Sequence, residues 1–208
     1  MGRRDDNRRA TFLAVTSAAA VLFASQGYAA TSIEQVAAAA GVSPGTVYNY
    51  FRTKGMLLLT VVLLRSSQTM DGVTAGVMAG IDDAASDPAR AVTSVAMTYV
   101  GPLLELERDL IAEVFGAWFR PSRSPLLPEI VAIDEHAIGN VAAILAGLQA
   151  TGAVRPEVDP GAAATLLFSA VMMALLVYLG DPDMDRAQVE GFIEAQVALA
   201  FAGIGPAG

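Results

Sequence analysis

Residues 31–54 read TSIEQVAAAAGVSPGTVYNYFRTK, and this stretch decides the architecture expected for the chain. Ser32 and Gln35 have the spacing of a capping box at the start of a short helix, and Gly41 stands where that helix would end in a left-handed turn. A second short helix is expected over residues 43–51, because a serine followed by proline and glycine is typical of a helix start. Two short helices joined by so tight a connection predict a helix-turn-helix unit.

The apolar residues of this stretch recur at spacings that place them on one side of the helix pair: Ile33, Val36, Ala37, Val42, Val47 and Phe51. Polar side chains of the second helix then face outward. An exposed Tyr48-Asn49-Tyr50 run does little for helix stability. Asparagine can bond adenine through two hydrogen bonds, and tyrosine or threonine hydroxyls can reach phosphate oxygens. We therefore expect this helix to read DNA, with a protein-contacting helix pair as the alternative.

The positions that carry this pattern, together with Leu22-Phe23 and Gly27-Tyr28 before them, resemble the DNA-binding domain of the tetracycline-repressor (TetR) family over roughly residues 9 to 65. The resemblance implies a homodimeric transcriptional regulator, in most cases a repressor, whose larger C-terminal domain binds a small molecule. Position by position, it implies DNA contacts from Thr31, Ser43, Gly45 (through its backbone N–H), Thr46, Tyr48, Asn49, Tyr50 and Lys54. Val21 departs from the family pattern, which commonly has a charged residue there.

The whole chain reads as all-α, because apolar residues recur at spacings of three and four with no sustained alternation of period two. About nine helices are expected, over residues 11–26, 32–40, 43–51, 53 through 64 and beyond, 88–100, 103–119, 128–150, 161–180 and 186–202. We predict a DNA-binding domain over residues 1–54, a helix from about residue 53 that links the domains, and an effector-binding and dimerisation domain over residues 55–208.

Charge is unevenly distributed along the 208 residues. The chain has 13 basic and 21 acidic residues, a net charge of −8, which by itself argues against a phosphate-rich partner. Residues 1–54 nevertheless carry +3, and the remainder carries −11. With 54% hydrophobic and 16% charged residues the chain is not of the disordered class. The absence of cysteine excludes disulfide scaffolds and thiol chemistry and fits a cytoplasmic protein.

Two segments have features of a secretory signal peptide and of a transmembrane helix, respectively. Arginines precede an apolar run over residues 12–24, but Asp5 and Asp6 interrupt the basic region, and cleavage would remove the first helix of the motif. Residues 161–180 lack charge and are long enough to span a bilayer. No basic cluster or tryptophan belt flanks them, so we expect a helix buried in protein and no membrane partner, with a membrane span as the remaining alternative.

The C-terminal body is less specific. Aromatic and methionine side chains suit an adaptable cavity for a hydrophobic or amphipathic effector, although each of them could equally be ordinary core. The candidates are Met97, Tyr99, Phe115, Trp118, Phe119, Phe168, Met172 and Met173. Pairing of the last two helices across a two-fold axis would form a four-helix interface. The candidates there are Val171, Leu175, Val189, Ile193, Val197 and Ala200.

Nothing in the sequence indicates catalysis, a metal or a cofactor. His136 is the one histidine, and there is no cysteine to complete a metal site. Asp181, Asp183 and Asp185 imitate the start of a calcium loop, but Arg186 stands where glycine is required and capping of the last helix explains the acidic residues better. We therefore expect a regulator and not an enzyme.

Overall fold

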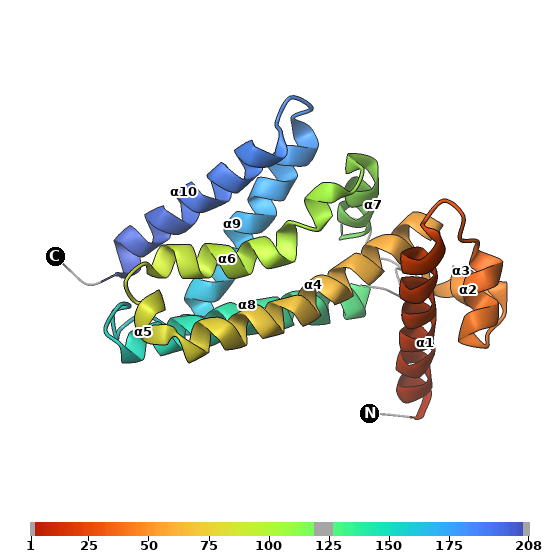
Figure 1. The fold of residues 1–208 in the computed structure, drawn as a ribbon, viewed down its shortest axis with the longest axis horizontal. Coiled ribbons are helices and arrows are strands. Elements are labelled where there is room, and N and C mark those ends of the chain that lie inside the picture. The colour runs from red at the N-terminus through yellow and green to blue at the C-terminus, as the bar shows by residue number, and fades with distance from the viewer. Residues whose placement is uncertain (1–2, 119–126, 206–208) are drawn as a thin grey trace. The chain divides into compact units, whose positions relative to one another are not determined.

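The computed structural model describes residues 3–118 and 127–205, with residues 3–5, 113, 114, 117, 118 and 127 described by their backbone alone (Figure 1). Within these ranges the chain is entirely helical, which confirms the predicted fold class. The elements are α1 (Arg3–Gln26), α2 (Ile33–Ala40), α3 (Pro44–Tyr50), α4 (Lys54–Ala79), α5 (Ile81–Ala84), α6 (Pro88–Val100), the 3₁₀-helix η1 (Leu103–Glu105), α7 (Arg108–Trp118), α8 (Leu127–Ala150), α9 (Pro160–Gly180) and α10 (Arg186–Ile204).

The chain forms two compact units. Unit 1 comprises Met1–Leu64 and Glu107–Val131, and unit 2 comprises Arg65–Leu106 and Ala132–Gly208. The helices α4 and α8 therefore each contribute residues to both units. The division along the sequence is more interleaved than the single boundary at residue 54 that we expected.

Helix boundaries differ from the prediction in three places. Ten α-helices are present in the described ranges, because the four-residue α5 adds to the nine expected. The first helix begins at Arg3 instead of residue 11, because polar and charged residues are as compatible with a helical turn as apolar ones. The helix expected over residues 103–119 is interrupted at Leu106, whose extended backbone (ψ 157°) separates η1 from α7.

Unit 1 is organised around apolar side chains of α1, α2 and α3. On α1, Phe12, Val15 and Ala19 are buried at spacings of three and four. They pack in the same unit as Val36 of α2 and Phe51, which directly follows α3. The Phe12 and Phe51 rings stack with their centroids 5.8 Å apart. This small core fixes the three helices of the predicted DNA-binding domain against one another.

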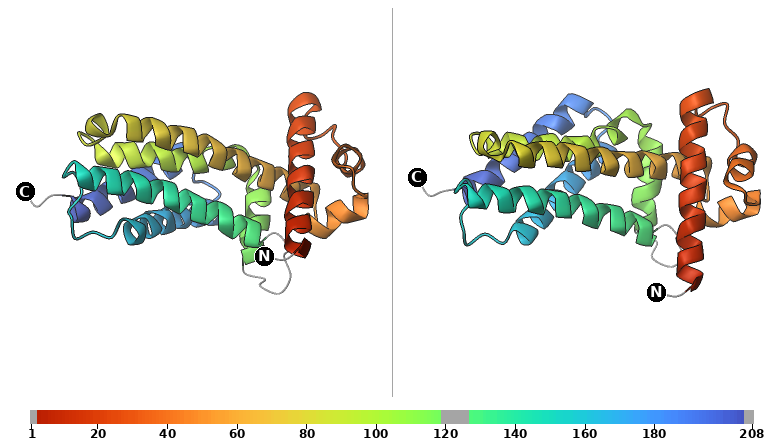
Figure 2. Two further views of the ribbon diagram at one scale, coloured as in Figure 1. Left: turned by 90° about the horizontal axis from the view of Figure 1, so that it is seen from below. Right: turned by 60° about the horizontal axis from the view of Figure 1, so that its bottom comes forward.

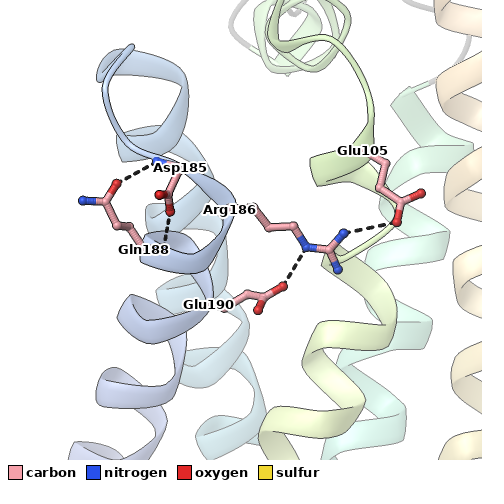
Figure 3. A network of polar contacts seen from close by, with 5 residues as sticks. All are labelled: Glu105, Asp185, Arg186, Gln188 and Glu190. Atoms are coloured by element: carbon pink, nitrogen blue, oxygen red, sulfur yellow. Dashed lines mark hydrogen bonds and ion pairs between the residues drawn. The ribbon is translucent and has the colours of Figure 1, made fainter.

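In unit 2, α10 packs against both α9 and α6. Figure 2 shows α8 running beside the C-terminal half of α4, where the side chains of His136 and Asp71 join the two helices. Asp159 caps α9 by accepting a hydrogen bond from the Ala162 N–H. The acidic residues before the last helix act in the predicted way, since Asp185 forms a capping box with Gln188 (Figure 3).

The start of α10 is tied to the segment after α6. Arg186 donates from Nε to Glu190 on its own helix, at 2.7 Å, and from Nη1 to Glu105 of η1, at 3.1 Å (Figure 3). Both carboxylates are solvent-accessible, so these pairs define geometry more than they add stability.

Two helices are long and apolar enough to cross a membrane by length and composition alone, Pro128–Ala150 and Pro160–Gly180. Their mean hydropathies are 1.4 and 2.2. Core helices of soluble proteins share these properties, so the feature is weak evidence for a span. Burial of α9 is only partial: Val171 and Leu175 are interior, whereas Leu166 and Met173 are 62% and 52% exposed. Within unit 2, one side of α9 is therefore interior and the other side is exposed.

The turn between α2 and α3 allows a matched test of the fold. Gly41 has φ +69°, and a Cβ added to it would meet no other atom within 4 Å, so the cost of Gly41→Ala comes from the left-handed backbone alone. We expect a loss of about 1 kcal/mol in the stability of unit 1, measured by thermal unfolding followed by circular dichroism. Gly45→Ala is the control: Gly45 lies in α3 without a positive φ, and a Cβ there meets only Ser43 Oγ at 3.8 Å. Equal effects of the two substitutions would contradict this interpretation.

Candidate nucleic-acid interface and interior cavity

The helix-turn-helix of unit 1 is held by local hydrogen bonds at each of its ends. Ser32 caps α2 and forms the predicted box with Gln35. The Gly41 N–H closes the C-terminal end of α2 on the carbonyls of Ala37 and Ala38. Ser43 caps α3, and its Oγ accepts a hydrogen bond from the Thr46 N–H at 3.1 Å. Both helices therefore begin and end at the residues that the sequence indicated.

The rotation of α3 about its axis is fixed by its buried side. Val47 and Phe51 are fully buried. With 3.6 residues per turn, residues 48 and 49 must point away from that side. Tyr48 is 49% exposed and Asn49 is exposed, as are Ser43 and Gly45 at the beginning of the helix, with Thr46 half-buried. The outward face of α3 thus presents hydroxyl and amide groups to solvent.

Two of the predicted contact residues serve the architecture of unit 1. The Thr31 side chain is 1% exposed, and its hydroxyl donates to the Gly27 carbonyl at 2.8 Å while accepting from Gln26 Nε2. The Tyr50 hydroxyl donates to the Arg8 carbonyl at 3.1 Å and so joins the end of α3 to α1. These placements give both residues a positioning role.

Lys54 combines a structural role with a charge. Its Nζ donates to the carbonyls of Tyr28 and Thr31, each at 3.0 Å, and lies 4.3 Å from the centroid of the Tyr28 ring. An ammonium group has three protons, so these two carbonyl bonds leave one donor. The preceding basic residue, Arg52, is exposed and was not among the predicted contacts. Arg52 lies two residues beyond the end of α3, and a basic residue at that position was the available signal in the sequence.

Charge also differs in sign between the two units, as it does between residues 1–54 and the rest of the chain. Unit 1 contains nine basic and seven acidic residues, a net charge of +2. Unit 2 contains four basic and fourteen acidic residues, a net charge of −10. The phosphate-attracting potential expected of a DNA-binding protein is therefore confined to unit 1.

Unit 2 contains a cavity of about 20 Å³, roughly the space of one water molecule. Its lining is apolar apart from one tyrosine hydroxyl: Met70, Val92, Ala96, Tyr99, Ala137, Val141, Leu167, Phe168, Val171 and Val197. Of the predicted pocket residues, Tyr99 and Phe168 are in this lining, and their ring centroids are 6.0 Å apart.

The other predicted pocket residues are placed elsewhere. Met97 and Met172 are half-buried and Met173 is exposed, and none of them lines the cavity. Phe115 is half-buried and belongs to unit 1. The Trp118 side chain and Phe119 lie outside the described residues.

A buried pair of polar side chains adjoins the cavity. The Tyr99 hydroxyl donates to Asp134 Oδ1, and the two residues are 3% and 8% exposed. Burial raises the pKa of Asp134 to about 6, against the lowering effect of the tyrosine hydrogen bond. Burial and the adjacent carboxylate raise the pKa of Tyr99 above its usual range. Sequence reasoning missed Asp134, because it stands in an Asp-Glu-His run that resembles a solvated helix face.

The predicted interface residues lie on the interior side of α9 and α10. Val171, Leu175, Val189, Ile193 and Val197 are at most 5% exposed within unit 2, and Ala200 is half-buried. The same two helices expose other apolar side chains: Leu166, Met173, Leu176 and Val177 on α9, and Phe192 and Leu199 on α10. We name these six residues the α9–α10 face.

His136 is paired on the surface of unit 2. Its Nε2 lies 2.6 Å from Asp71 Oδ1, which also accepts from Asn140. Among the residues that the structure describes, no group of three or more histidine, cysteine or acidic side chains could hold a metal ion.

Asp134 generates a pH-dependent prediction for stability. Because folding raises its pKa to about 6, the folded state binds this proton more readily than the unfolded chain does. Its contribution to stability is therefore complete below about pH 4 and is lost as the pH rises through 6. Asp134→Asn removes the ionisation and keeps an oxygen that can accept from Tyr99.

We expect the stability of this variant relative to the parent protein to increase by the order of 1–3 kcal/mol between pH 5 and pH 8. Denaturant unfolding at the two pH values measures the difference. Glu135→Gln, which removes the neighbouring exposed carboxylate, should show no such increase. A pH-independent difference for Asp134→Asn would contradict the prediction.

Comparison with known proteins places this geometry in a family. The family model for bacterial regulatory proteins of the tetR family matches residues 15–61, which span the helix-turn-helix. No curated protein sequence matches the chain. Among solved structures, Thermus thermophilus FadR, a TetR-family transcriptional repressor in complex with lauroyl-CoA, is 22% identical with a TM-score of 0.61, over 95% of this chain and 100% of that one.

Bacillus subtilis FadR in complex with stearoyl-CoA is 19% identical, with a TM-score of 0.55 over 93% of this chain and 99% of that one. At these identities the two structures show a shared fold. The match over residues 15–61 shows that this segment is similar to the N-terminal domain of TetR-family regulators, and the chain shares the fold of the two solved structures.

Proposed function

We propose that the protein is a DNA-binding transcriptional regulator, most simply a cytoplasmic repressor that leaves a palindromic operator when a small apolar or amphipathic effector binds. The observation that carries the proposal is the exposed face of α3, where Tyr48 and Asn49 project from a helix whose rotation Val47 and Phe51 fix. We assign it no catalytic function, and it needs no cofactor for this role.

Base recognition falls to Asn49. Its amide carries both a donor and an acceptor, which match the N7 and N6 groups of adenine in the major groove. In this proposal the side chains of Ser43, Thr46 and Tyr48 and the backbone N–H of Gly45 contact phosphates, which fix register without carrying sequence information. Thr31 and Tyr50 contribute by holding α1, α2 and α3 together.

Cations at the end of α3 add the non-specific part of the affinity. Arg52 is exposed, and Lys54 retains one donor beyond its two carbonyl bonds. Each phosphate neutralised by such a side chain releases a counterion, so binding would weaken as salt increases. The −10 charge of unit 2 would disfavour unproductive contacts of that unit with DNA.

A homodimer is part of the proposal, because one short recognition helix reads too few bases to select a site. The α9–α10 face supports the homodimer, because its six exposed residues are all apolar and come from two helices that pack against each other. Two such faces would form a four-helix interface around a two-fold axis.

The alternative is that the helix-turn-helix contacts another protein. That alternative requires no dependence on DNA sequence and no steep dependence on salt, so a single binding experiment separates the two.

Asn49→Ala should weaken binding to a duplex selected from a random-sequence pool by about 1–3 kcal/mol, because the paired hydrogen bonds to one base are lost. On unselected DNA the loss should be small. Fluorescence anisotropy with labelled duplexes at several salt concentrations measures both affinities and the salt slope, which is about −0.9 per phosphate neutralised.

Arg52→Ala is the matched control, because loss of a phosphate contact should weaken selected and unselected duplexes alike and reduce the salt slope by about 1. Lys54 is less suitable as a control, because its carbonyl bonds make it structural. Equal losses on both duplexes for Asn49→Ala would remove its base-reading role. Failure of the protein to enrich any duplex would favour the protein-contact alternative.

Leu199→Glu should weaken self-association by more than about 2 kcal/mol, because the carboxylate would be buried without a partner in the proposed interface. Leu199 is 75% exposed, so the monomer should fold normally. Sedimentation equilibrium measures the dissociation constant, and circular dichroism checks the fold. Val21→Glu is the control, because Val21 is 67% exposed but belongs to α1 of unit 1. A dimer unchanged by Leu199→Glu would refute the α9–α10 face as the interface.

A further inference from the structure

The cavity of unit 2 adjoins a buried acidic side chain, that of Asp134. Tyr99 lines the cavity and directs its hydroxyl to Asp134. Asp134 precedes the lining residues Ala137 and Val141 by three and seven positions on α8, so the three residues lie on one face of that helix. A buried carboxylate therefore lies next to a residue that lines the apolar cavity.

No cation of unit 2 is placed in that interior. The basic side chains of the unit are Arg65, Arg90, Arg155 and Arg186, and all four are exposed, as is His136. In the described part of the chain, the hydrogen-bond partner of Asp134 is the neutral Tyr99 hydroxyl. Buried carboxylates are stabilised most effectively by a cation with hydrogen-bonding protons, and here the protein supplies none from unit 2.

Two further polar groups lie along the same side of the site. Ser66 Oγ and Thr74 Oγ1 are buried and have no hydrogen-bond partner among the described residues. They stand one turn before and one turn after Met70 on α4, and Met70 lines the cavity. Buried hydroxyls usually have partners, so these two indicate hydrogen-bonding capacity that the present packing leaves unused.

The cavity is small in this conformation, but its wall has an adaptable side. Nine of its ten lining residues are buried, whereas Phe168 is half-buried and reaches the surface. Phe168 packs against Tyr99, and Met70 adds a flexible thioether to the lining. Movement of these two side chains would enlarge the space next to the Tyr99–Asp134 pair.

We propose that this cavity binds a cationic amphipathic molecule, whose apolar body displaces Phe168 and Met70 and whose protonated amine donates a hydrogen bond to Asp134 in place of the Tyr99 hydroxyl. The proposal rests on the proposed function in treating unit 2 as the effector-binding part. The net charge of −10 on this unit attracts cations and opposes anionic ligands. The inferred ligand class thus differs from the acyl-CoA molecules in the two FadR structures described above.

Three compounds with one body and different head groups test the proposal: 4-phenylbutylamine, 4-phenylbutanol and 4-phenylbutyrate. Isothermal titration calorimetry on the full chain at pH 7.5, without DNA, gives the three affinities. We expect the amine to bind about tenfold more tightly than the alcohol, and the carboxylate to bind more weakly than either. Asp134→Asn should reduce the affinity for the amine to that for the alcohol and leave alcohol binding intact, which also shows that the cavity is folded.

Glu135→Gln is the matched control, because it removes an adjacent exposed carboxylate and should leave the order of affinities unchanged. A carboxylate compound that binds as tightly as the amine, a preference that survives Asp134→Asn, or no saturable binding of the amine up to millimolar concentration would each overturn the proposal. DNA binding is measured separately on the same samples. Amine binding without DNA binding would refute the proposed function and support the cation site. DNA binding without amine binding would refute the cation site and support the proposed function.

Discussion

The packing of Phe51 against Phe12 is the constraint on which the recognition surface depends. Phe51 is fully buried directly after α3, and the two rings stack 5.8 Å apart. Any rotation of α3 that buried Asn49 would expose this aromatic surface and desolvate an amide, and both changes cost free energy. The hydrogen bond from Tyr50 to the Arg8 carbonyl opposes the same rotation. An apolar contact in the interior of unit 1 thus determines which polar side chains of α3 face outward.

The net charge differs in sign between the two units. A net charge of −8 for the whole chain conceals +2 on unit 1 and −10 on unit 2. Because long-range potentials follow the local sum of charges, each unit attracts a different partner: phosphates for unit 1, and cations for unit 2. Solution ions screen these fields beyond roughly 10 Å at ordinary salt. The charges therefore bias which molecules arrive, while in the two proposals specificity would rest on the short contacts of Asn49 and Asp134.

The features that the sequence predicted well are those decided within one helical turn. The Ser32 capping box, the capping of α10 by an acidic residue and the left-handed Gly41 each depend on residues at most four positions apart. Long-range packing escaped prediction. Thr31 looks like a polar surface residue but is buried, and Asp134 bonds a tyrosine 35 positions away. The apolar character of α9 on all its sides gave no means of choosing the side that faces the interior of unit 2. The predicted interface residues Val171 and Leu175 lie on that interior side.

The helix α4 connects unit 1 with the cavity wall of unit 2 through the covalent chain. It begins at Lys54, whose ammonium binds the carbonyls of Tyr28 and Thr31 in unit 1, and it continues to Met70 in the cavity wall of unit 2. Burial disfavours the ionised form of Asp134. A bound ammonium group would stabilise that form, but only in a conformation whose cavity is large enough to hold the ligand. A ligand can shift a protein between two conformations only if it binds one of them more tightly. Here the two conformations would differ in the position of Met70. In the proposed mechanism, a ligand that displaces Met70 would therefore act on the helix that begins at Lys54.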